Sequence, residues 1–406
     1  MSQGKYIGNV NILDIRKATP EAVAEISGVG NANLVLYSPE TAGLLAKLSF
    51  GNINSTVEVP SDVKVDMVMG KTTIRREYFE NLAAPVYLFV MGQIAIEPDV
   101  TAENIEKGIN GMVVFGQVIC PEQLQGAVQS KTRSIFGKLK TYPVLKHIRR
   151  DAFEMDANAL STLEDKTEMV VLDSLSMPEV LPGDLFEQKI HKLFVLNEVK
   201  CHAENADALK ARLVDGSGPV TAIPAGFLDV DKPLVIDNTL LESLSVKKLW
   251  CEELVQIDAG VTAAMLDEHL DGIVSQELIL CPQALKSTFI KKCDLLKNKV
   301  VFYEGLLWLV DDERTLRASF LETVEDKITL LVTGELTIDP ALDYKLLAAR
   351  LAKVHNFGLI RGTPDQTGAI QARLGLSEGS LEDSSQKEEP AEPASDQIGN
   401  ANYLTL

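Results

Sequence analysis

The chain has 406 residues, 46% of them hydrophobic, and a formal net charge of −19 at pH 7. This composition supports a large buried core, while the negative charge argues against nucleic acid as a partner. The sequence contains neither an apolar run of about 18 residues nor a charged leader followed by an apolar run. It therefore predicts a cytoplasmic protein that does not span a membrane.

One short motif, Gly-Asn-x-Asn preceded by an apolar residue, occurs four times. The composition predicts roughly 0.05 occurrences by chance, so the copies indicate an internal repeat. Three copies lie close to the N-terminus and the fourth is almost at the end of the chain, where it predicts the start of another strand. The copies are Ile7 to Asn11, Val29 to Asn33, Phe50 to Asn54 and Ile398 to Asn402.

Strand and helix patterns alternate through the rest of the folded part. Each unit has an alternating apolar stretch, a break at Gly or a polar residue, a second short stretch, a Pro or Asp, and a helical segment such as Thr101 to Ile109. Units of 22 to 29 residues cannot bury their apolar face alone, so neighbours must stack. The clearest units begin at Val86, Met112, Leu193, Leu249, Gly272 and Ile328.

These repeats predict an α/β solenoid over residues 1–375. We expect about 14 stacked repeats with a parallel β-sheet and short flanking helices, forming one elongated domain. The stretch INGMVVFGQVICPEQL, from Ile109 to Leu124, resembles a leucine-rich repeat in its apolar spacing and its Pro-x-x-Leu exit. The Asn of that family would fall at Gln117 and is absent, and a β-solenoid with helices on one flank fits equally well. The resemblance implies a protein-binding or scaffolding surface and no chemistry.

Motifs for catalysis, cofactors and metals are absent from the sequence. Cys120, Cys201 and Cys281 occupy the repeat slot that Ile96 and Ile338 hold elsewhere, which favours packing in the core. The cysteines are five in number and irregularly spaced, as in a reducing compartment. We therefore expect no enzyme activity, no cofactor, no metal and no small-molecule substrate.

A basic segment interrupts the repeats at residues 131–150, where their spacing is least regular. It contains seven basic residues and no acidic one. The segment is either a solvated insert or helix face, or an anion-seeking patch for an acidic protein segment, a membrane surface or nucleic acid. The seven residues are Lys131, Arg133, Lys138, Lys140, Lys146, Arg149 and Arg150.

The C-terminal part changes in composition after residue 375. Residues 376–397 are acidic and lack aromatic side chains, so they predict a disordered linker. Residues 398–406, IGNANYLTL, are instead strand-like and repeat the N-terminal motif. A stack of rungs ends in a strand with unpaired backbone groups, and the first rung has no evident cap. The C-terminal peptide can add there as a preceding rung, with its asparagines in register.

In this interpretation, the length of the linker determines whether the peptide docks on its own chain or on a neighbouring copy. If about 14 rungs form one column, the body is roughly 67 Å long, whereas the linker spans about 26 Å when relaxed and ~75 Å at most. Docking onto a protomer stacked end to end is therefore favoured. The expected assembly residues are Ile7, Gly8, Asn9 and Asn11 on the edge, and Ile398, Gly399, Asn400, Asn402, Tyr403, Leu404 and Leu406 on the peptide.

Three functional hypotheses follow, of which the first is preferred. The chain is a structural scaffold or filament subunit that assembles with itself through its C-terminal peptide. Alternatively, it is a monomeric module that recognises a protein partner on its sheet face. The third hypothesis is an enzyme whose chemistry no motif reveals.

Overall fold

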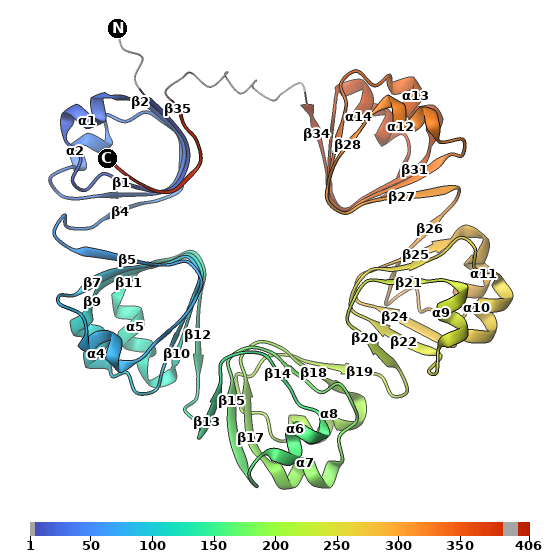
Figure 1. The fold of residues 1–406 in the computed structure, drawn as a ribbon, viewed down its shortest axis with the longest axis horizontal. Helices are drawn as coiled ribbons and strands as arrows, with labels where there is room; N and C mark the ends of the chain where they lie inside the picture. Colours follow the sequence, from blue (N-terminus) through green and yellow to red (C-terminus); the bar gives the residue numbers. More distant parts are fainter. Residues whose placement is uncertain (1–4, 385–396) are drawn as a thin grey trace. The chain divides into compact units, whose positions relative to one another are not determined.

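The chain folds into an α/β solenoid of short parallel strands, as the sequence predicts. The computed structural model describes residues 5–384 and 397–406. Within them, nine parallel sheets combine into five groups of rungs, here called stacks (Figure 1). The stacks, in chain order, are stack 1 (residues 5–58 with 397–405), stack 2 (64–142), stack 3 (147–223), stack 4 (228–303) and stack 5 (306–383).

Stack 1 contains both ends of the described chain. Its strands are β1 (Lys5–Asp14), β2 (Ile26–Tyr37), β3 (Phe50–Ile53), β4 (Thr56–Glu58), β35 (Gln397–Ile398) and β36 (Ala401–Thr405). Its helices are α1 (Pro20–Ala24) and α2 (Ala42–Leu45). The strand order is β3-β2-β1-β35, with β36 also on β1 and β4 also on β2.

In stacks 2 and 3, a rung has a first and a second strand. The first strands form one sheet, the second strands form another, and short helices follow the second strands. The strands of stack 2 are β5 (Lys64–Val68), β6 (Lys71–Ile74), β7 (Val86–Val90), β8 (Gln93–Ile96), β9 (Ile109–Val114), β10 (Gln117–Pro121), β11 (Thr132–Ile135) and β12 (Lys138–Tyr142), and its helices are α3 (Arg76–Glu80), α4 (Ala102–Gly108), η1 (Glu122–Leu124) and α5 (Gln125–Lys131). The strands of stack 3 are β13 (His147–Arg149), β14 (Phe153–Glu154), β15 (Thr167–Val171), β16 (Leu175–Ser176), β17 (Ile190–Val195), β18 (Val199–His202) and β19 (Val220–Ile223), and its helices are α6 (Ala157–Thr162), α7 (Gly183–Lys189) and α8 (Ala203–Lys210).

Stacks 4 and 5 repeat this arrangement. The strands of stack 4 are β20 (Leu228–Val230), β21 (Leu234–Ile236), β22 (Lys248–Cys251), β23 (Val255–Ile257), β24 (Gly272–Ser275), β25 (Leu278–Pro282) and β26 (Lys299–Tyr303), and its helices are α9 (Asn238–Ser243), α10 (Ala263–His269), η2 (Gln283–Leu285) and α11 (Lys286–Phe289). The strands of stack 5 are β27 (Leu306–Val310), β28 (Glu313–Leu316), β29 (Ile328–Val332), β30 (Glu335–Ile338), β31 (Leu351–Asn356), β32 (Leu359–Gly362), β33 (Leu374–Ser377) and β34 (Ser380–Asp383), and its helices are α12 (Ala318–Thr323), α13 (Tyr344–Arg350) and α14 (Pro364–Gln371).

The rungs do not form the single column on which the sequence-based body length of roughly 67 Å depends. Each stack is four rungs deep, and the next strand of the chain starts a new sheet. Pro60, Pro143 and Pro224 follow the last rungs of stacks 1, 2 and 3 closely. Each of these prolines lies in the connection to the next stack and lacks the N–H that a ladder hydrogen bond needs. The chain divides into two compact units, one with stacks 1 to 3 and the C-terminal peptide, the other with stacks 4 and 5.

The first strands of inner rungs such as β7 and β29 are buried on both faces. In β7, Val86, Leu88 and Val90 belong to the core of stack 2 beneath its helices. Tyr87 and Phe89 belong to a second cluster that also contains residues of stack 1. A strand with two buried faces has a continuous apolar sequence, as in VYLFV. Successive side chains along such a strand therefore point alternately into two different cores, rather than into a core and into solvent.

Side-chain caps start several of the short helices that follow the second strands. Thr101 accepts a hydrogen bond from the backbone N–H of Asn104 at 3.2 Å, and the Asn104 side chain accepts one from the Thr101 N–H at 3.0 Å. This reciprocal capping satisfies two N–H groups that a helix start leaves unpaired. It places α4 within the helical segment that the sequence predicts at residues 101–109.

Stacks 2 and 3 correspond in detail to stacks 4 and 5. The Tyr142 hydroxyl donates to the carbonyl of Ile96 at 2.6 Å, and the Tyr303 hydroxyl donates to that of Ile257 at 2.7 Å. The two tyrosines are 161 positions apart, as are the two isoleucines. The same offset relates Cys120 to Cys281, Pro121 to Pro282 and Asn205 to Gln366. A unit of two stacks is therefore used twice, and stack 1 stands outside it.

The last rung of stack 5 extends past the expected solenoid boundary at residue 375. Strands β33 and β34 carry the fold to Asp383. Residues 385–396 of the predicted linker lie outside the described residues.

Candidate assembly site

The C-terminal peptide is the fourth rung of stack 1. Strand β35 pairs with β1 at Ile7 and Ile398, and β36 pairs with it at Ile12 and Tyr403, both in parallel. Stacks 2 to 5 each contain a four-stranded sheet built from consecutive chain, whereas stack 1 has, in the described part of the chain, only three rungs of its own. The peptide supplies the missing one (Figure 1).

The peptide pairs with β1 of its own chain. The linker and body lengths assumed from the sequence disfavour this docking. That expectation assumed one continuous column of rungs between the N-terminal edge and the linker. Because the rungs form five separate stacks, the assumed distance does not apply.

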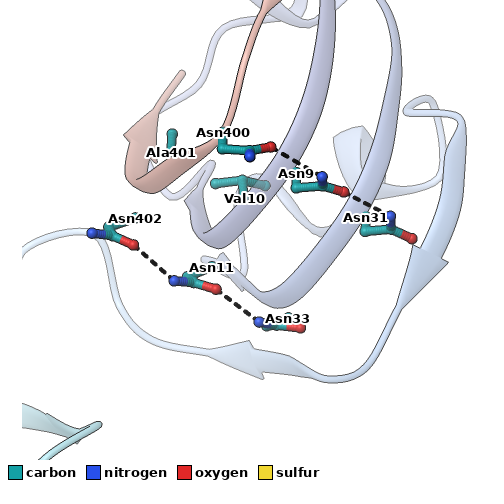
Figure 2. A pocket seen from close by; sticks show the side chains of 8 residues that line it. All are labelled: Asn9, Val10, Asn11, Asn31, Asn33, Asn400, Ala401 and Asn402. Atoms are coloured by element: carbon teal, nitrogen blue, oxygen red, sulfur yellow. Dashed lines mark hydrogen bonds between the residues drawn. The ribbon is translucent and has the colours of Figure 1, made fainter. Parts of the chain in front are cut away.

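Two columns of asparagine side chains join the peptide to stack 1. In one column, Asn9 donates to the side-chain oxygen of Asn400 at 3.0 Å, and Asn31 donates to Asn9 at 2.7 Å. Figure 2 shows this column beside the second one, in which Asn11 donates to Asn402 at 2.8 Å. Asn33 and Asn54 continue the second column with further bonds of 2.8 Å. All four copies of the motif therefore pair in the same register.

A cavity of about 580 Å³ lies over these two columns. Val10 and Ala401, each of which separates two asparagines along its strand, also line the cavity (Figure 2). The lining is rich in amides and contains no charged side chain among the residues Asn9, Val10, Asn11, Asn31, Asn33, Asn400, Ala401 and Asn402.

The C-terminal end of the peptide contacts a buried ion pair. Arg16 binds Asp14 through Nε at 2.9 Å and through Nη2 at 2.8 Å, and both residues are at most 9% exposed. The Tyr403 hydroxyl donates to the same Asp14 carboxylate. The backbone N–H of Leu406 donates to the Asp14 carbonyl at 3.0 Å. Arg16 also donates to the Val63 carbonyl at 2.8 Å, so the pair holds the segment that leaves stack 1.

These contacts shift two pKa values in opposite directions. Burial raises the pKa of the Asp14 carboxyl, but hydrogen bonds from Arg16 and Tyr403 outweigh it and hold the pKa below its usual value. Burial, together with the bond to Asp14, raises the pKa of Tyr403 to about 12. The docked arrangement therefore favours an ionised Asp14 and a neutral Tyr403.

Apolar side chains anchor both faces of β36. Ala401, Leu404 and Leu406 pack against the core of stack 1. Tyr403 packs against the cluster that stacks 1 and 2 share, which includes Ile12 and Tyr87. The peptide thus contributes to two cores at once. The Ile398 side chain lies outside the described part of the structure.

The motif glycines allow the rungs of stack 1 to approach closely. A Cβ atom on Gly30 would lie 2.6 Å from the carbonyl oxygen of Gly8, and one on Gly51 would lie 2.6 Å from that of Gly30. A Cβ on Gly399 meets nothing within 4 Å, because the peptide is the outermost described rung. Glycine is therefore required inside the stack but not at its outer edge.

The basic segment at residues 131–150 is part of the solenoid. It forms β11, β12 and β13, the end of stack 2 and the beginning of stack 3. Most of its cations have partners in this chain, whereas Arg133 and Lys138 occupy exposed positions of β11 and β12. The partners are the Glu106 carbonyl for Lys131, Asn197 for Lys140, Glu164 for Lys146, the Phe153 ring for Arg149 and Glu97 for Arg150.

The cysteines are interior, which confirms the predicted packing role of Cys120, Cys201 and Cys281. Burial raises the pKa of Cys120 and of Cys281 to about 12. Across residues 5–384 and 397–406, no group of three or more His, Cys, Asp or Glu side chains could hold a metal ion. In the same ranges, no helix is long and apolar enough to cross a membrane.

Sequence reasoning missed a second groove, beside the Asn11 column. Its other wall consists of Met91, Phe115 and Phe136 of stack 2. Each of these residues precedes a glycine, as Met69 does in the first rung of stack 2. This recurring pair of an apolar residue and a glycine is the sequence signal that could have predicted the groove. It marks the corner between the two sheets, where a Cβ on Gly116 would lie only 1.9 Å from the Gly92 carbonyl.

The fold and this site define a solenoid repeat protein with an added C-terminal rung. Neither the family models nor the curated proteins nor the solved structures include a match to this chain.

Proposed function

We propose that this chain is a structural, self-assembling solenoid protein whose C-terminal peptide is an exchangeable strand. The observation that carries the proposal is the incomplete stack 1, which takes its fourth rung from residues 397–405. A neighbouring copy carries the same peptide and can supply the same rung. Exchange of an identical element between protomers is a low-cost route to assembly.

The described docking contacts support exchange because they do not depend on the linker. They join the peptide to β1, to Asp14 and to the cores around Ile12. A peptide from another copy would make all of them unchanged. Release of the peptide would leave the β1 edge with unpaired backbone groups, which invite another strand.

Protein concentration sets the balance between the two forms of docking. Docking within one chain is unimolecular, so it is favoured in dilute solution. Exchange becomes favourable as the concentration of copies approaches the effective concentration of the tethered peptide. Reciprocal exchange then gives closed dimers, and one-way exchange gives open chains.

The test compares the full-length protein with a variant that lacks residues 397–406. We expect light scattering and negative-stain electron microscopy to show concentration-dependent assemblies of the full-length protein and none of the variant. An excess of the free peptide IGNANYLTL should shorten the assemblies, while a scrambled peptide of the same composition should not. A full-length protein that stays monomeric at every concentration contradicts the proposal.

The proposal places the protein in the cytoplasm and assigns it no catalysis. All five cysteines are free, in keeping with a reducing compartment.

A second candidate function is recognition of a partner on the sheet face by a monomer. The observation that favours it is the side-chain column that stack 2 exposes beside the Asn11 column. A protein that remains monomeric but binds a ligand through this face would support this function over assembly.

A further inference from the structure

Stack 2 exposes a column of apolar side chains at the corner between its two sheets. The column consists of Met69, Met91, Phe115 and Phe136, one from each rung. Met69 is 53% exposed and Phe136 is 55% exposed. The rings of Phe115 and Phe136 stack with centroids 5.0 Å apart and planes 12° apart. The column is therefore ordered at the rung spacing although much of it faces solvent.

This column faces the second asparagine column of stack 1 across a groove. Asn11, Asn33 and Asn54 line one wall, and Met91, Phe115 and Phe136 line the other. We call this the amide–aromatic groove. Its volume is about 490 Å³, within the range of small-molecule sites. A shared core that includes Ile12, Tyr87 and Phe115 holds its two walls together.

The amide wall retains hydrogen-bonding capacity. A side-chain amide has two N–H donors and two lone pairs on its oxygen. Asn33 donates once to Asn11 and accepts once from Asn54. One N–H and one lone pair of Asn33 therefore remain for a ligand. Among the described residues, no charged side chain lines the groove, in a chain whose net charge is −19.

We propose that the amide–aromatic groove binds an uncharged linear oligosaccharide. A pyranose ring has an apolar C–H face, which suits the Met and Phe wall, and a rim of hydroxyl groups that donate to and accept from amides. Rungs repeat every ~4.8 Å, close to the length of one sugar ring in a linear chain. Successive rings can therefore make the same pair of contacts at successive rungs.

Two other ligand classes fit this groove less well. An anionic polymer is repelled by the negative charge of the chain. An extended peptide repeats its side chains every ~6.7 Å along one face, so it falls out of step with the two columns. The groove residues belong to stacks 1 and 2 rather than to the C-terminal peptide, so the inference does not depend on strand exchange.

The test uses the full-length protein and four probes, namely cello-, malto-, laminari- and chito-oligosaccharides. We expect saturation-transfer NMR to detect binding of at least one probe, and titration calorimetry to give an affinity that added salt leaves unchanged, because the contacts carry no charge. Phe136→Ala and Asn54→Ala should each weaken this binding at least about tenfold, since each removes a contact repeated along one wall.

The matched control is Ile135→Ala, which removes an apolar side chain that is 47% exposed and does not line the groove. It should bind as the wild type does. Because Phe136 and Asn54 are exposed, we expect both variants to remain folded. Circular dichroism melting curves check this.

Several outcomes overturn the assignment. They are the absence of saturation transfer to all four probes, an affinity that Phe136→Ala leaves unchanged, and binding that salt abolishes. A parallel experiment uses an uncharged extended peptide, and saturation transfer to that peptide but to none of the sugars overturns the assignment too. A dimer that dissociates on Phe136→Ala substitution shows instead that the groove is an interface between copies.

Discussion

The hydroxyl of Tyr403 donates a hydrogen bond to the carboxylate of Asp14, which lies 389 positions earlier in the chain. Asp14 is held in turn by Arg16, which also reaches the carbonyl of Val63. The last residues of the chain thus contact the first strand directly, and they are linked through Arg16 to the segment that leads out of stack 1. This relationship makes peptide docking measurable through single side chains.

Tyr403→Phe should weaken docking of the peptide. The substitution removes a hydrogen bond to a charged group, worth about 2 kcal/mol, while Asp14 keeps its bonds to Arg16. The expected loss of affinity is roughly 30-fold. Fluorescence anisotropy of a labelled peptide 397–406 on a protein truncated before it measures this loss. Thr405→Ala is the matched control, because Thr405 is exposed; equal affinities of all three peptides would show that the bond contributes nothing.

Peptide docking should weaken at high pH. Tyr403 has its ordinary pKa of 10.0 in the free peptide and a pKa of about 12 when docked. Docking needs the neutral phenol, so its contribution is complete below pH 10 and is lost as the pH rises toward 12. Linkage sets the slope at up to about tenfold per pH unit. Anisotropy titrations between these values measure it, and the Tyr403→Phe peptide should show no such slope.

The direction of the asparagine columns predicts an asymmetry between two substitutions. Asn11 donates to Asn402, so Asn11→Asp removes the donor and sets a carboxylate against an amide oxygen. Asn402→Asp keeps the acceptor and should change the affinity by less than about threefold. We expect Asn11→Asp to weaken docking at least about tenfold. The reverse order in a binding assay would mean that the amides donate in the opposite direction.

The cysteines should be unreactive in the native protein. Cys120 and Cys281 are fully buried, and burial raises the pKa of each to about 12, so the reactive thiolate is scarce at neutral pH. We expect a thiol reagent to label Cys120, Cys201 and Cys281 only after denaturation. Mass spectrometry of labelled peptides separates the sites, and rapid native labelling of any of them would contradict the observed core.

Charge reversal in the basic segment should act mainly through stability. Arg150 binds Glu97 at 2.6 Å, and the Glu97 side chain is only 10% exposed. Arg150→Glu leaves this carboxylate without its partner and should destabilise the protein by about 1–2 kcal/mol. Lys138→Glu is the control, because Lys138 is exposed at the start of β12. Denaturant unfolding measures both, and equal midpoints would show that the Arg150 pair is not stabilising.

Local periodicity explains which features could be predicted from the sequence. The apolar stretches, the helical segment at residues 101–109 and the buried slot of Cys120 all depend on neighbours within one rung or on the next. The register of the Gly-Asn-x-Asn copies follows similarly, because identical segments satisfy their side chains best when stacked in step.

The grouping of rungs into stacks could not be read from the repeats themselves. A rung carries the same apolar pattern whether its neighbour continues the stack or starts another. The linker lengths were compared with a single column of rungs, and such a column does not form. The buried pair of Asp14 and Arg16 was missed since its partner Tyr403 lies at the other end of the chain.

The sequence by itself therefore determined the solenoid class, the repeat of strand and helix and the kinship between the first strand and the last. Only the tertiary structure decided that stack 1 lacks a rung of its own, that the chain's own peptide fills it, and that an amide column faces an aromatic one. The physical reason is the separation along the chain of the residues in contact. Rung formation depends on contacts between neighbouring repeats, whereas closure of stack 1 and the walls of the groove depend on contacts between rungs far apart in the chain.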